Sequence, residues 1–424
     1  MVTMPAEITK ETCVYTPPVP IGTDSPDSQH KVIIVRLSKN KNFIDQEKEF
    51  HKMRAKRNIP FFNYSALFER QKKEIMACLE DVLSRGAFIL QKDLEEFEDR
   101  LKSYLGVKYA FGVADGTNAL ILALRAAGIG PGDEVILSSH TYIATAASVH
   151  FAGATPVLTE CGPDHMLDPD DIEYRITSKT KAIMPTQLNG RTCNMDVIEK
   201  IADQNGLLII EDAAQALGSQ YKGKHAGTFG KAGTFSLYPA KLLGCFGDGG
   251  VVVTNDDDMG RKLFLLRDHG RDENGEVVTW GTNSRLDNMQ AAVLNLKMKT
   301  FDQELARRRE IAGMYHDDLK DINDLTLPPE PVSDGDHFDV YQNYELEAGQ
   351  RDSLREFLTD RGVRTIIQWA GKAVHQFKNL GFDDVRLPVT DAFFKRCFML
   401  PMHTALSNDD VEYICQTIQE FYAQ

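Results

Sequence analysis

Short apolar runs alternate with helical patterns from Tyr109 to Asp212, and this feature restricts the fold more than any other. The runs are Tyr109–Val113, Glu134–Leu137, Thr155–Leu158, Lys181–Pro185 and Leu207–Ile210. Helical spacing separates them at Thr117–Ala127, Ile143–Ala152, Pro169–Ile176 and Met195–Gln204. Such alternation is typical of a parallel sheet with helices on both faces. Ligands of these sheets bind at the carboxyl ends of the strands, so polar residues there are candidate site residues.

The flanking segments complete a predicted α/β fold. Helical spacing covers much of Phe68–Leu105, and apolar runs at Ala232–Leu237 and Gly250–Thr254 predict two strands near the sheet edge. A long helix is predicted from about Asn288 toward Met314, followed by short strands and helices. We therefore predict a large domain over 59–290 and a small α+β domain over 291–424, which includes the long helix. Residues 1–58 form a separate extension, and its Pro-, Thr- and Ser-rich start predicts disorder in part.

Composition excludes several classes of function. The formal net charge is −14, which disfavours binding to nucleic acid. No apolar run approaches the ~18 residues of a membrane-spanning helix, and the start lacks the pattern of a signal peptide. We therefore expect a cytoplasmic protein. The seven cysteines form no C-x-x-C pair, which predicts scattered reduced thiols and no metal site.

Two candidate sites follow predicted strands directly. Asp115-Gly116-Thr117-Asn118 is a glycine turn into a helix, where backbone N–H groups can bind phosphate. An ordinary helix cap explains the same residues. Glu211-Asp212 ends a buried strand, where a carboxylate needs a partner such as a protonated ring nitrogen. A helix cap is again the alternative, so these residues alone leave both interpretations open.

Two further segments combine polar residues with an apolar setting. Lys241 lies in the loop Tyr238-Pro239-Ala240-Lys241-Leu242-Leu243-Gly244, after a predicted strand. Burial would lower the pKa of this amine and make it fit to form a Schiff base, whereas a surface lysine is the alternative. Polar residues also crowd Asn283-Ser284-Arg285-Leu286-Asp287-Asn288 at a helix start. Capping would explain only one or two of them.

Taken together, these motifs resemble the DegT/DnrJ/StrS-type sugar aminotransferases, which are fold-type I enzymes dependent on pyridoxal phosphate (PLP). The resemblance covers roughly Ile59 to Tyr422. It is carried by the segments D-G-T-N-A-L, T-Y-I-A-T, I-I-E-D-A-A-Q, F-S-L-Y-P-A-K-L-L-G, G-D-G-G, N-S-R-L-D-N-M-Q-A-A and L-P-M-H, in one order. It implies a mostly parallel seven-stranded sheet between helices and a small C-terminal domain.

The resemblance also implies roles for residues around the cofactor. Lys241 matches the lysine that forms the Schiff base, and Asp212 matches the aspartate that pairs with the pyridine nitrogen. Gln215 matches the residue beside the ring hydroxyl, and Tyr142 matches the aromatic residue that stacks on the ring. The matches to phosphate contacts are Gly116, Thr117 and Ser236.

Two more matches concern the neighbouring subunit and the substrate. Asn283 matches an asparagine that reaches the phosphate of the neighbouring subunit's cofactor, which implies a homodimer with shared sites. Arg285 lies where some members bind an acidic or hydroxylated part of the sugar.

The sequence departs from the family pattern in two segments expected to face the sugar. Where members commonly read P-V-H-L-Y-G, this chain reads Pro185-Thr186-Gln187-Leu188-Asn189-Gly190. Where they often read H-Y-P, it reads Gln368-Trp369-Ala370. We therefore expect Gln187, Asn189 and Trp369 to shape the substrate pocket, with packing between the domains as the alternative for Trp369.

The resemblance predicts an aminotransferase that moves an amino group from glutamate or glutamine to a keto sugar, most readily a nucleotide-linked one. Pyridoxamine phosphate would form between the two half-reactions. The N-S-R-L-D segment favours amination at C3 over C4. Two alternatives share the fold: a sugar dehydratase, in which a histidine would replace Lys241, and a non-catalytic regulatory protein, which need not keep Lys241 and Asp212.

Overall fold

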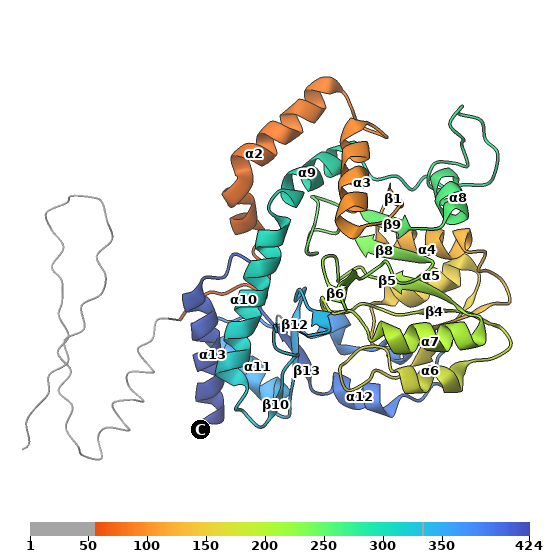
Figure 1. Ribbon diagram of the computed structural model, residues 1–424. Helices are drawn as coiled ribbons and strands as arrows, with labels where there is room; N and C mark the ends of the chain where they lie inside the picture. Colours follow the sequence, from red (N-terminus) through yellow and green to blue (C-terminus); the bar gives the residue numbers. More distant parts are fainter. Residues whose placement is uncertain (1–55, 333–334) are drawn as a thin grey trace, which may run out of the picture. The chain divides into compact units, whose positions relative to one another are not determined.

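The predicted sheet lies at the centre of the computed structural model, which describes residues 56–332 and 335–424 (Figure 1). Its strands are β1 (Tyr109–Val113), β2 (Glu134–Ser138), β3 (Thr155–Thr159), β4 (Thr180–Met184), β5 (Leu208–Asp212), β8 (Ala232–Ser236) and β9 (Gly250–Thr254). They run in the order β1-β9-β8-β5-β4-β2-β3. Only β9 is antiparallel to its neighbours, β1 and β8. The prediction of a mostly parallel seven-stranded sheet is confirmed.

Helices cover both faces of this sheet. One face packs on α4 (Gly116–Ala126), α5 (Ile143–Ala152) and α8 (Asp257–Arg267). The other packs on α3 (Lys92–Leu105), α6 (Pro169–Arg175), α7 (Met195–Asn205) and α9 (Asn288–Met298). Alternate residues of β2 divide between the faces: Val135 and Leu137 join the cluster with α4, and Ile136 joins the cluster with α7. Burial on both sides explains why the strands are apolar throughout.

Local signals fix several helix ends. α4 begins after Asp115, whose side chain accepts a hydrogen bond from the N–H of Asn118 at 2.8 Å. α2 (Tyr64–Arg85) ends at Gly86, whose φ of 61° is left-handed. Glycine adopts this conformation easily because it has no Cβ. These caps satisfy backbone groups that a helix end leaves unpaired.

The long helix predicted from Asn288 is two helices. α9 ends at Met298, and α10 (Phe301–Leu319) begins after Lys299 and Thr300. The charges explain the break: Lys297 lies in the last turn of α9, and Asp302 and Glu304 lie in the first turn of α10. Cations stabilise helix C-termini and anions stabilise N-termini.

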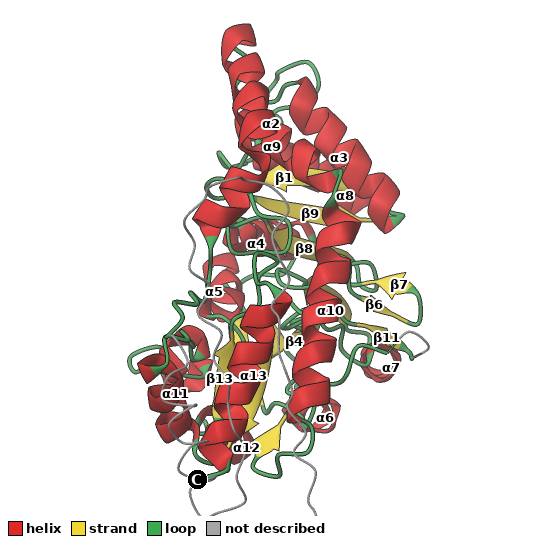
Figure 2. Cartoon of the chain, turned by 90° about the vertical axis from the view of Figure 1, so that its left-hand side faces the viewer, coloured by secondary structure: helices red, strands yellow, loops and turns green. Residues whose placement is uncertain are grey.

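α10 leads into a smaller antiparallel sheet. Its strands are β10 (Leu325–Thr326), β12 (Tyr344–Ala348) and β13 (Cys397–Leu400), in that order. The helices beside it are α11 (Arg351–Asp360), α12 (Pro388–Phe394) and α13 (Asn408–Tyr422), with 3-10 turns at Gln368–Gly371 and Val374–Gln376. Figures 1 and 2 show α13 beside α10. A third sheet joins β6 (Gln220–Tyr221), β7 (Lys224–His225) and β11 (His337–Phe338).

The start of the described chain belongs to this smaller sheet region. Ile59 pairs in parallel with Val363, and the His403 Nε2 atom lies 3.2 Å from the carbonyl oxygen of Pro60. Residues 57–424 form one compact unit, and the domain boundary after residue 290 stays a prediction. The extension predicted over 1–58 lies outside the described residues up to residue 55.

Two other predictions are tested by the described residues. Six cysteines there are free thiols, namely Cys78, Cys161, Cys193, Cys245, Cys397 and Cys415, whereas Cys13 lies outside. Across 56–332 and 335–424 we find no helix with both the length and the apolar character to cross a membrane.

Candidate active site

Lys241 and Asp212 meet at the carboxyl edge of the large sheet. Asp212 is the last residue of β5, and Lys241 follows β8, the neighbouring strand. Burial lowers the pKa of Lys241 to about 8, although the charge of Asp212 acts in the opposite direction. Burial likewise raises the pKa of Asp212. Above about pH 8 the pair therefore presents a free amine near a buried carboxylate, and no cation of the described residues forms an ion pair with that carboxylate within 4 Å.

Two donors hold the Asp212 carboxylate in place. The Thr145 hydroxyl donates to Oδ2 at 2.7 Å, and the Ala214 N–H donates to Oδ1 at 3.2 Å. Thr145 lies in the first turn of α5, and its Oγ1 is also 2.7 Å from that of Thr141. Sequence reasoning gave Thr145 no role, although it ends the T-Y-I-A-T segment that was part of the resemblance.

The residues predicted to bind phosphate lie together at the start of α4. Gly116 and Thr117 are its first two residues, and Ser236 ends β8 beside them. A Cβ on Gly116 would lie 2.9 Å from the Cβ of Ser236, so only glycine allows this approach. Asp115 caps the helix, as the alternative interpretation expects, and phosphate binding at this turn stays a prediction. Free N–H groups of a helix N-terminus suit an anion.

Three other predicted site residues are exposed or half-buried in this chain. Tyr142 precedes α5 and is 55% exposed, which leaves its ring free to stack on a ligand. Asn283 is exposed and pairs through its backbone with Asp268. Arg285 is half-buried, and its Nη1 atom donates to the Asp268 carboxylate at 2.8 Å.

The prediction that Gln187 faces the sugar is wrong. Its side chain is fully buried and donates to Glu211 at 2.8 Å, while its own oxygen accepts from the N–H of Cys193 at 2.7 Å. Glu211 also accepts from the backbone N–H groups of Gly227, Phe229 and Gly230 at 2.6 to 3.0 Å. Gln187 therefore belongs to a clamp inside the fold and has no surface for a substrate.

The two departures from the family pattern meet in space. The Gln368 amide donates to Asn189 Oδ1 at 2.6 Å, although the two residues are 179 positions apart. Trp369 is half-buried, with its ring centroid 5.2 Å from that of His140 and 6.3 Å from that of Phe394. These contacts favour the packing alternative for Trp369, whose role toward a substrate stays a prediction.

Gln215 follows shortly after Asp212 in the sequence and contacts Asn189. Its Oε1 atom accepts from the backbone N–H of Asn189 at 2.9 Å. Because a backbone N–H can only donate, the amide nitrogen of Gln215 must point elsewhere. Gln215 is therefore available as a donor, as its predicted place beside a ring hydroxyl requires.

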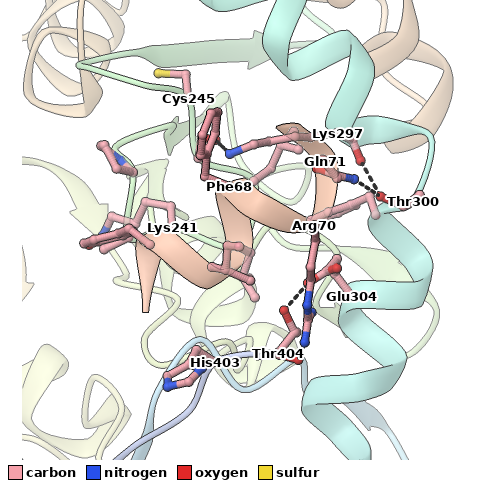
Figure 3. Close-up of a pocket in the computed structure, with 18 of the residues that line it drawn as sticks. Phe68, Arg70, Gln71, Lys241, Cys245, Lys297, Thr300, Glu304, His403 and Thr404 are labelled. Atoms are coloured by element: carbon pink, nitrogen blue, oxygen red, sulfur yellow. Dashed lines mark hydrogen bonds between the residues drawn. The ribbon is translucent and has the colours of Figure 1, made fainter. Parts of the chain in front are cut away.

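A cavity of about 470 Å³ is lined in part by the Lys241 loop. It is bounded by α2, α10 and the loop at His403 and Thr404. Figure 3 shows Lys241 at one side and Arg70, Lys297 and Glu304 at the other. The cavity thus gives a substrate room next to the reactive amine.

Comparison with known proteins agrees with this geometry. The model of the DegT/DnrJ/EryC1/StrS aminotransferase family matches residues 69–419. The chain belongs to this family. It is therefore an aminotransferase of fold-type I, and the family's aminotransferases use PLP.

Three similar proteins illustrate the range of the DegT/DnrJ/EryC1/StrS family. A "pleiotropic regulatory protein" of Geobacillus stearothermophilus is 38% identical over 86% of this chain and 99% of its own. The dTDP-3-amino-3,4,6-trideoxy-alpha-D-glucose transaminase of Streptomyces venezuelae is also 38% identical, over 86% of this chain and 96% of its own. The structure of NtdA of Bacillus subtilis, solved with pyridoxamine phosphate, matches with a TM-score of 0.81 at 28% identity. The match covers 88% of this chain and 87% of NtdA.

The residues present fit the family's cofactor. Asp212 has a buried carboxylate that would suit a ring nitrogen, and Lys241 has an amine of lowered pKa that would suit an aldehyde. Gln215 has an amide donor that would suit a ring oxygen. The start of α4 offers free N–H groups to the phosphate, next to Gly116 and Ser236. The chain thus carries residues whose chemistry would suit each polar group of PLP, and their roles toward it stay predictions.

Proposed function

We propose that this protein is a PLP-dependent aminotransferase that transfers an amino group from glutamate or glutamine to a nucleotide-linked keto sugar. The observation that carries the proposal is the pairing of Lys241, with its pKa near 8, and the buried Asp212 at the end of adjacent strands. Bound there, PLP would supply an electron sink. Asp212 would hold a proton on the ring nitrogen, and the Lys241 amine would move a proton on the face that it occupies.

The cavity beside Lys241 supports a phosphate-bearing substrate. Arg70, Lys297 and Arg308 line it, against one carboxylate, Glu304. Among the described residues none of these three cations forms an ion pair within 4 Å; each donates to backbone carbonyl groups. A positive cavity in a chain of net charge −14 attracts an anionic ligand such as a nucleoside diphosphate.

Amination at C3 is the proposed regiochemistry. It is supported by the N-S-R-L-D segment and by the similarity to the Streptomyces venezuelae relative, a 3-amino sugar transaminase. Enzyme loaded with pyridoxamine phosphate should convert a nucleotide 3-keto sugar to an amine, read by mass spectrometry. A matched 4-keto sugar is the control. Faster conversion of the 4-keto sugar would contradict the preference.

A homodimer with shared sites is also proposed. Asn283 is exposed and adds no contact to the Asp212 site of its own chain among the hydrogen bonds of the described residues. Nearby, Val277, Val278 and Trp280 are 57 to 94% exposed. Apolar side chains gathered on a surface are typical of interfaces, and a second subunit would cover them.

The cofactor test separates this proposal from its rivals. Reduction with borohydride should fix a pyridoxyl group on Lys241, and Lys241→Ala should lose both label and turnover. Lys297 provides the matched control, because burial lowers its pKa and it lines the same cavity. Label on Lys297 instead would refute the assignment. A dehydratase would yield a product lacking a hydroxyl group, and a regulatory protein would show no turnover.

A further inference from the structure

A buried chain of polar side chains connects the smaller sheet to Gln215. It begins at Glu345 in β12, which is 2% exposed. Glu345 Oε2 accepts from the Asn189 side-chain amide at 2.7 Å. Asn189 Oδ1 in turn accepts from Asn343 at 2.8 Å, and Asn343 also reaches Gln215 Oε1 at 3.4 Å. The two ends of the chain decide which way its amides point.

The Glu345 end of the chain faces His140. The Nδ1 atom of His140 lies 2.8 Å from the carbonyl oxygen of His165, so this nitrogen carries a proton. The opposite ring nitrogen, Nε2, lies 3.4 Å from Glu345 Oε2. Among the described residues His140 Nε2 forms no hydrogen bond, and the side-chain amide of Asn189 is the donor that Glu345 Oε2 accepts from, at 2.7 Å.

The Gln215 end is fixed by a backbone group. Asn189 has a φ of 56°, a left-handed conformation that asparagine tolerates better than most residues. Its side chain makes hydrogen bonds to Glu345, Asn343 and Gln368, which hold this conformation. The Asn189 N–H thereby points at Gln215 Oε1. A reversed Gln215 amide would set two donors against each other at 2.9 Å.

Both acceptor positions of Gln215 Oε1 are therefore filled. Asn189 N–H and the Asn343 amide occupy them, at 2.9 and 3.4 Å. Among the described residues the Gln215 amide nitrogen forms no hydrogen bond. It is therefore left free as a donor for a ligand.

We propose that Glu345 and Asn343 are positioning residues that act through Asn189 to fix Gln215 as a hydrogen-bond donor toward the ring oxygen of the cofactor. The inference rests on the proposed function, since it requires PLP beside Asp212. It assigns a purpose to a buried carboxylate far from the reacting amine. A buried carboxylate destabilises the fold unless hydrogen-bond donors compensate for the lost water, and this network supplies such donors to Glu345.

Spectroscopic titration of the cofactor-loaded protein tests the proposal. A hydrogen-bond donor at the ring oxygen of the cofactor would draw negative charge away from the Lys241 nitrogen. A proton on that nitrogen would then be less stable. Losing the donor should therefore raise the pH midpoint, at which the absorption band of the protonated Schiff base gives way to that of the unprotonated one. One neutral hydrogen bond corresponds to about half a unit to one unit. Asp212 and Lys241, whose charges also act on this equilibrium, stay unchanged in every variant.

Glu345→Leu removes the acceptor and should raise the midpoint, whereas Glu345→Gln keeps an acceptor oxygen and should retain the wild-type value. Asn343→Asp keeps nearly the same side-chain size but places an acceptor opposite Gln215 Oε1, so it should also raise the midpoint. This variant keeps the inference testable if Glu345→Leu fails to fold. Glu347→Leu is the matched control, because Glu347 lies on the same strand but binds His165 and Arg396.

A double-mutant cycle separates positioning from general damage. Gln215→Leu alone should raise the midpoint, and adding Glu345→Leu should raise it no further. Additive shifts, or wild-type midpoints in both Glu345→Leu and Asn343→Asp, would overturn the inference. A wild-type protein without a visible band would instead refute the proposed function, so the two failures are distinguishable.

Discussion

At the scale of single residues, burial prepares Lys241 for chemistry before any ligand arrives. Its pKa near 8 leaves about a tenth of the amine uncharged at pH 7, against about one part in three thousand at the ordinary 10.5. The opposing effect of Asp212 keeps this pKa from falling further. The same carboxylate thus limits the reactivity that burial creates.

The first prediction concerns that balance. In cofactor-free protein, acylation of Lys241 followed by mass spectrometry should show a pH midpoint near 8. Asp212→Asn removes a negative charge that favours the protonated amine, so the midpoint should move lower. Lys181, on an exposed position of β4, serves as the reference lysine. An unchanged or higher midpoint in Asp212→Asn would contradict the pairing.

The second prediction concerns the donor that holds Asp212. Thr145→Val keeps the size of the side chain but removes the 2.7 Å hydrogen bond to a buried carboxylate. We expect a loss of about 1–3 kcal/mol in the free energy of unfolding, measured by urea denaturation at pH 7. Thr145→Ser retains the hydroxyl and should lose less. Equal losses in the two variants would show that the methyl group, not the hydrogen bond, matters.

At the scale of elements, Glu211 fastens β5 to the turn that precedes β8. Glu211 and Asp212 are neighbours, and because side chains alternate along a strand they face opposite sides of the sheet. Glu211 therefore enters the core, where Gly227, Phe229 and Gly230 donate to it, and Asp212 enters the site. One dipeptide thus supplies both a structural clamp and a candidate catalytic carboxylate.

The third prediction tests this clamp. Glu211→Gln would turn an amide NH₂ group toward donors that need an acceptor. We expect a loss of at least about 2 kcal/mol in the free energy of unfolding, measured in urea. Glu199→Gln is the control: Glu199 forms an exposed ion pair with Lys224 at 3.6 Å and should cost under about 1 kcal/mol. Similar losses in both variants would contradict the clamp.

The elements were predictable where the pattern was long and regular. The alternation from Tyr109 to Asp212 predicted β1 to β5 and the helices between them. The break between α9 and α10 was missed because apolar spacing continues across it, although the change from Lys297 to Asp302 and Glu304 was a readable signal. Gln187 was misplaced because its partner, Glu211, is distant in sequence, and pairing of buried polar groups cannot be read from spacing.

At the scale of the whole molecule, the fourth prediction concerns subunits that share a site. If Asn283 completes the neighbouring site, Asn283→Ala should weaken PLP binding by titration while leaving Lys241 intact. Mixing Lys241→Ala and Asn283→Ala subunits should then restore activity, because one hybrid site keeps both residues. Thr282→Ala, at the adjacent position, is the control. A fully active monomer in ultracentrifugation would refute the shared site.

At this scale too, resemblance and physical reasoning contributed differently. The resemblance assigned Lys241 and Asp212 to one site, and the structure places their segments at the ends of adjacent strands, while their roles stay predictions. The chain from Glu345 to Gln215 could not be predicted. Its members come from β12, the loop after β4 and the loop after β5, and only the packed fold puts them in contact.

The pairing of Ile59 with Val363 has a consequence for biosynthesis. The described chain begins at a segment whose partners here lie near the other end of the sequence: Pro60 and His403 are 343 residues apart, and Arg57 and Asp410 are 353. While the ribosome builds the large sheet, these partners have not yet been made. The other buried members of the Ile59 cluster lie between Ile311 and Ile418, so Ile59 gains these contacts only when that part of the chain emerges. A nascent chain stalled before Val363 would therefore be a natural client for chaperones.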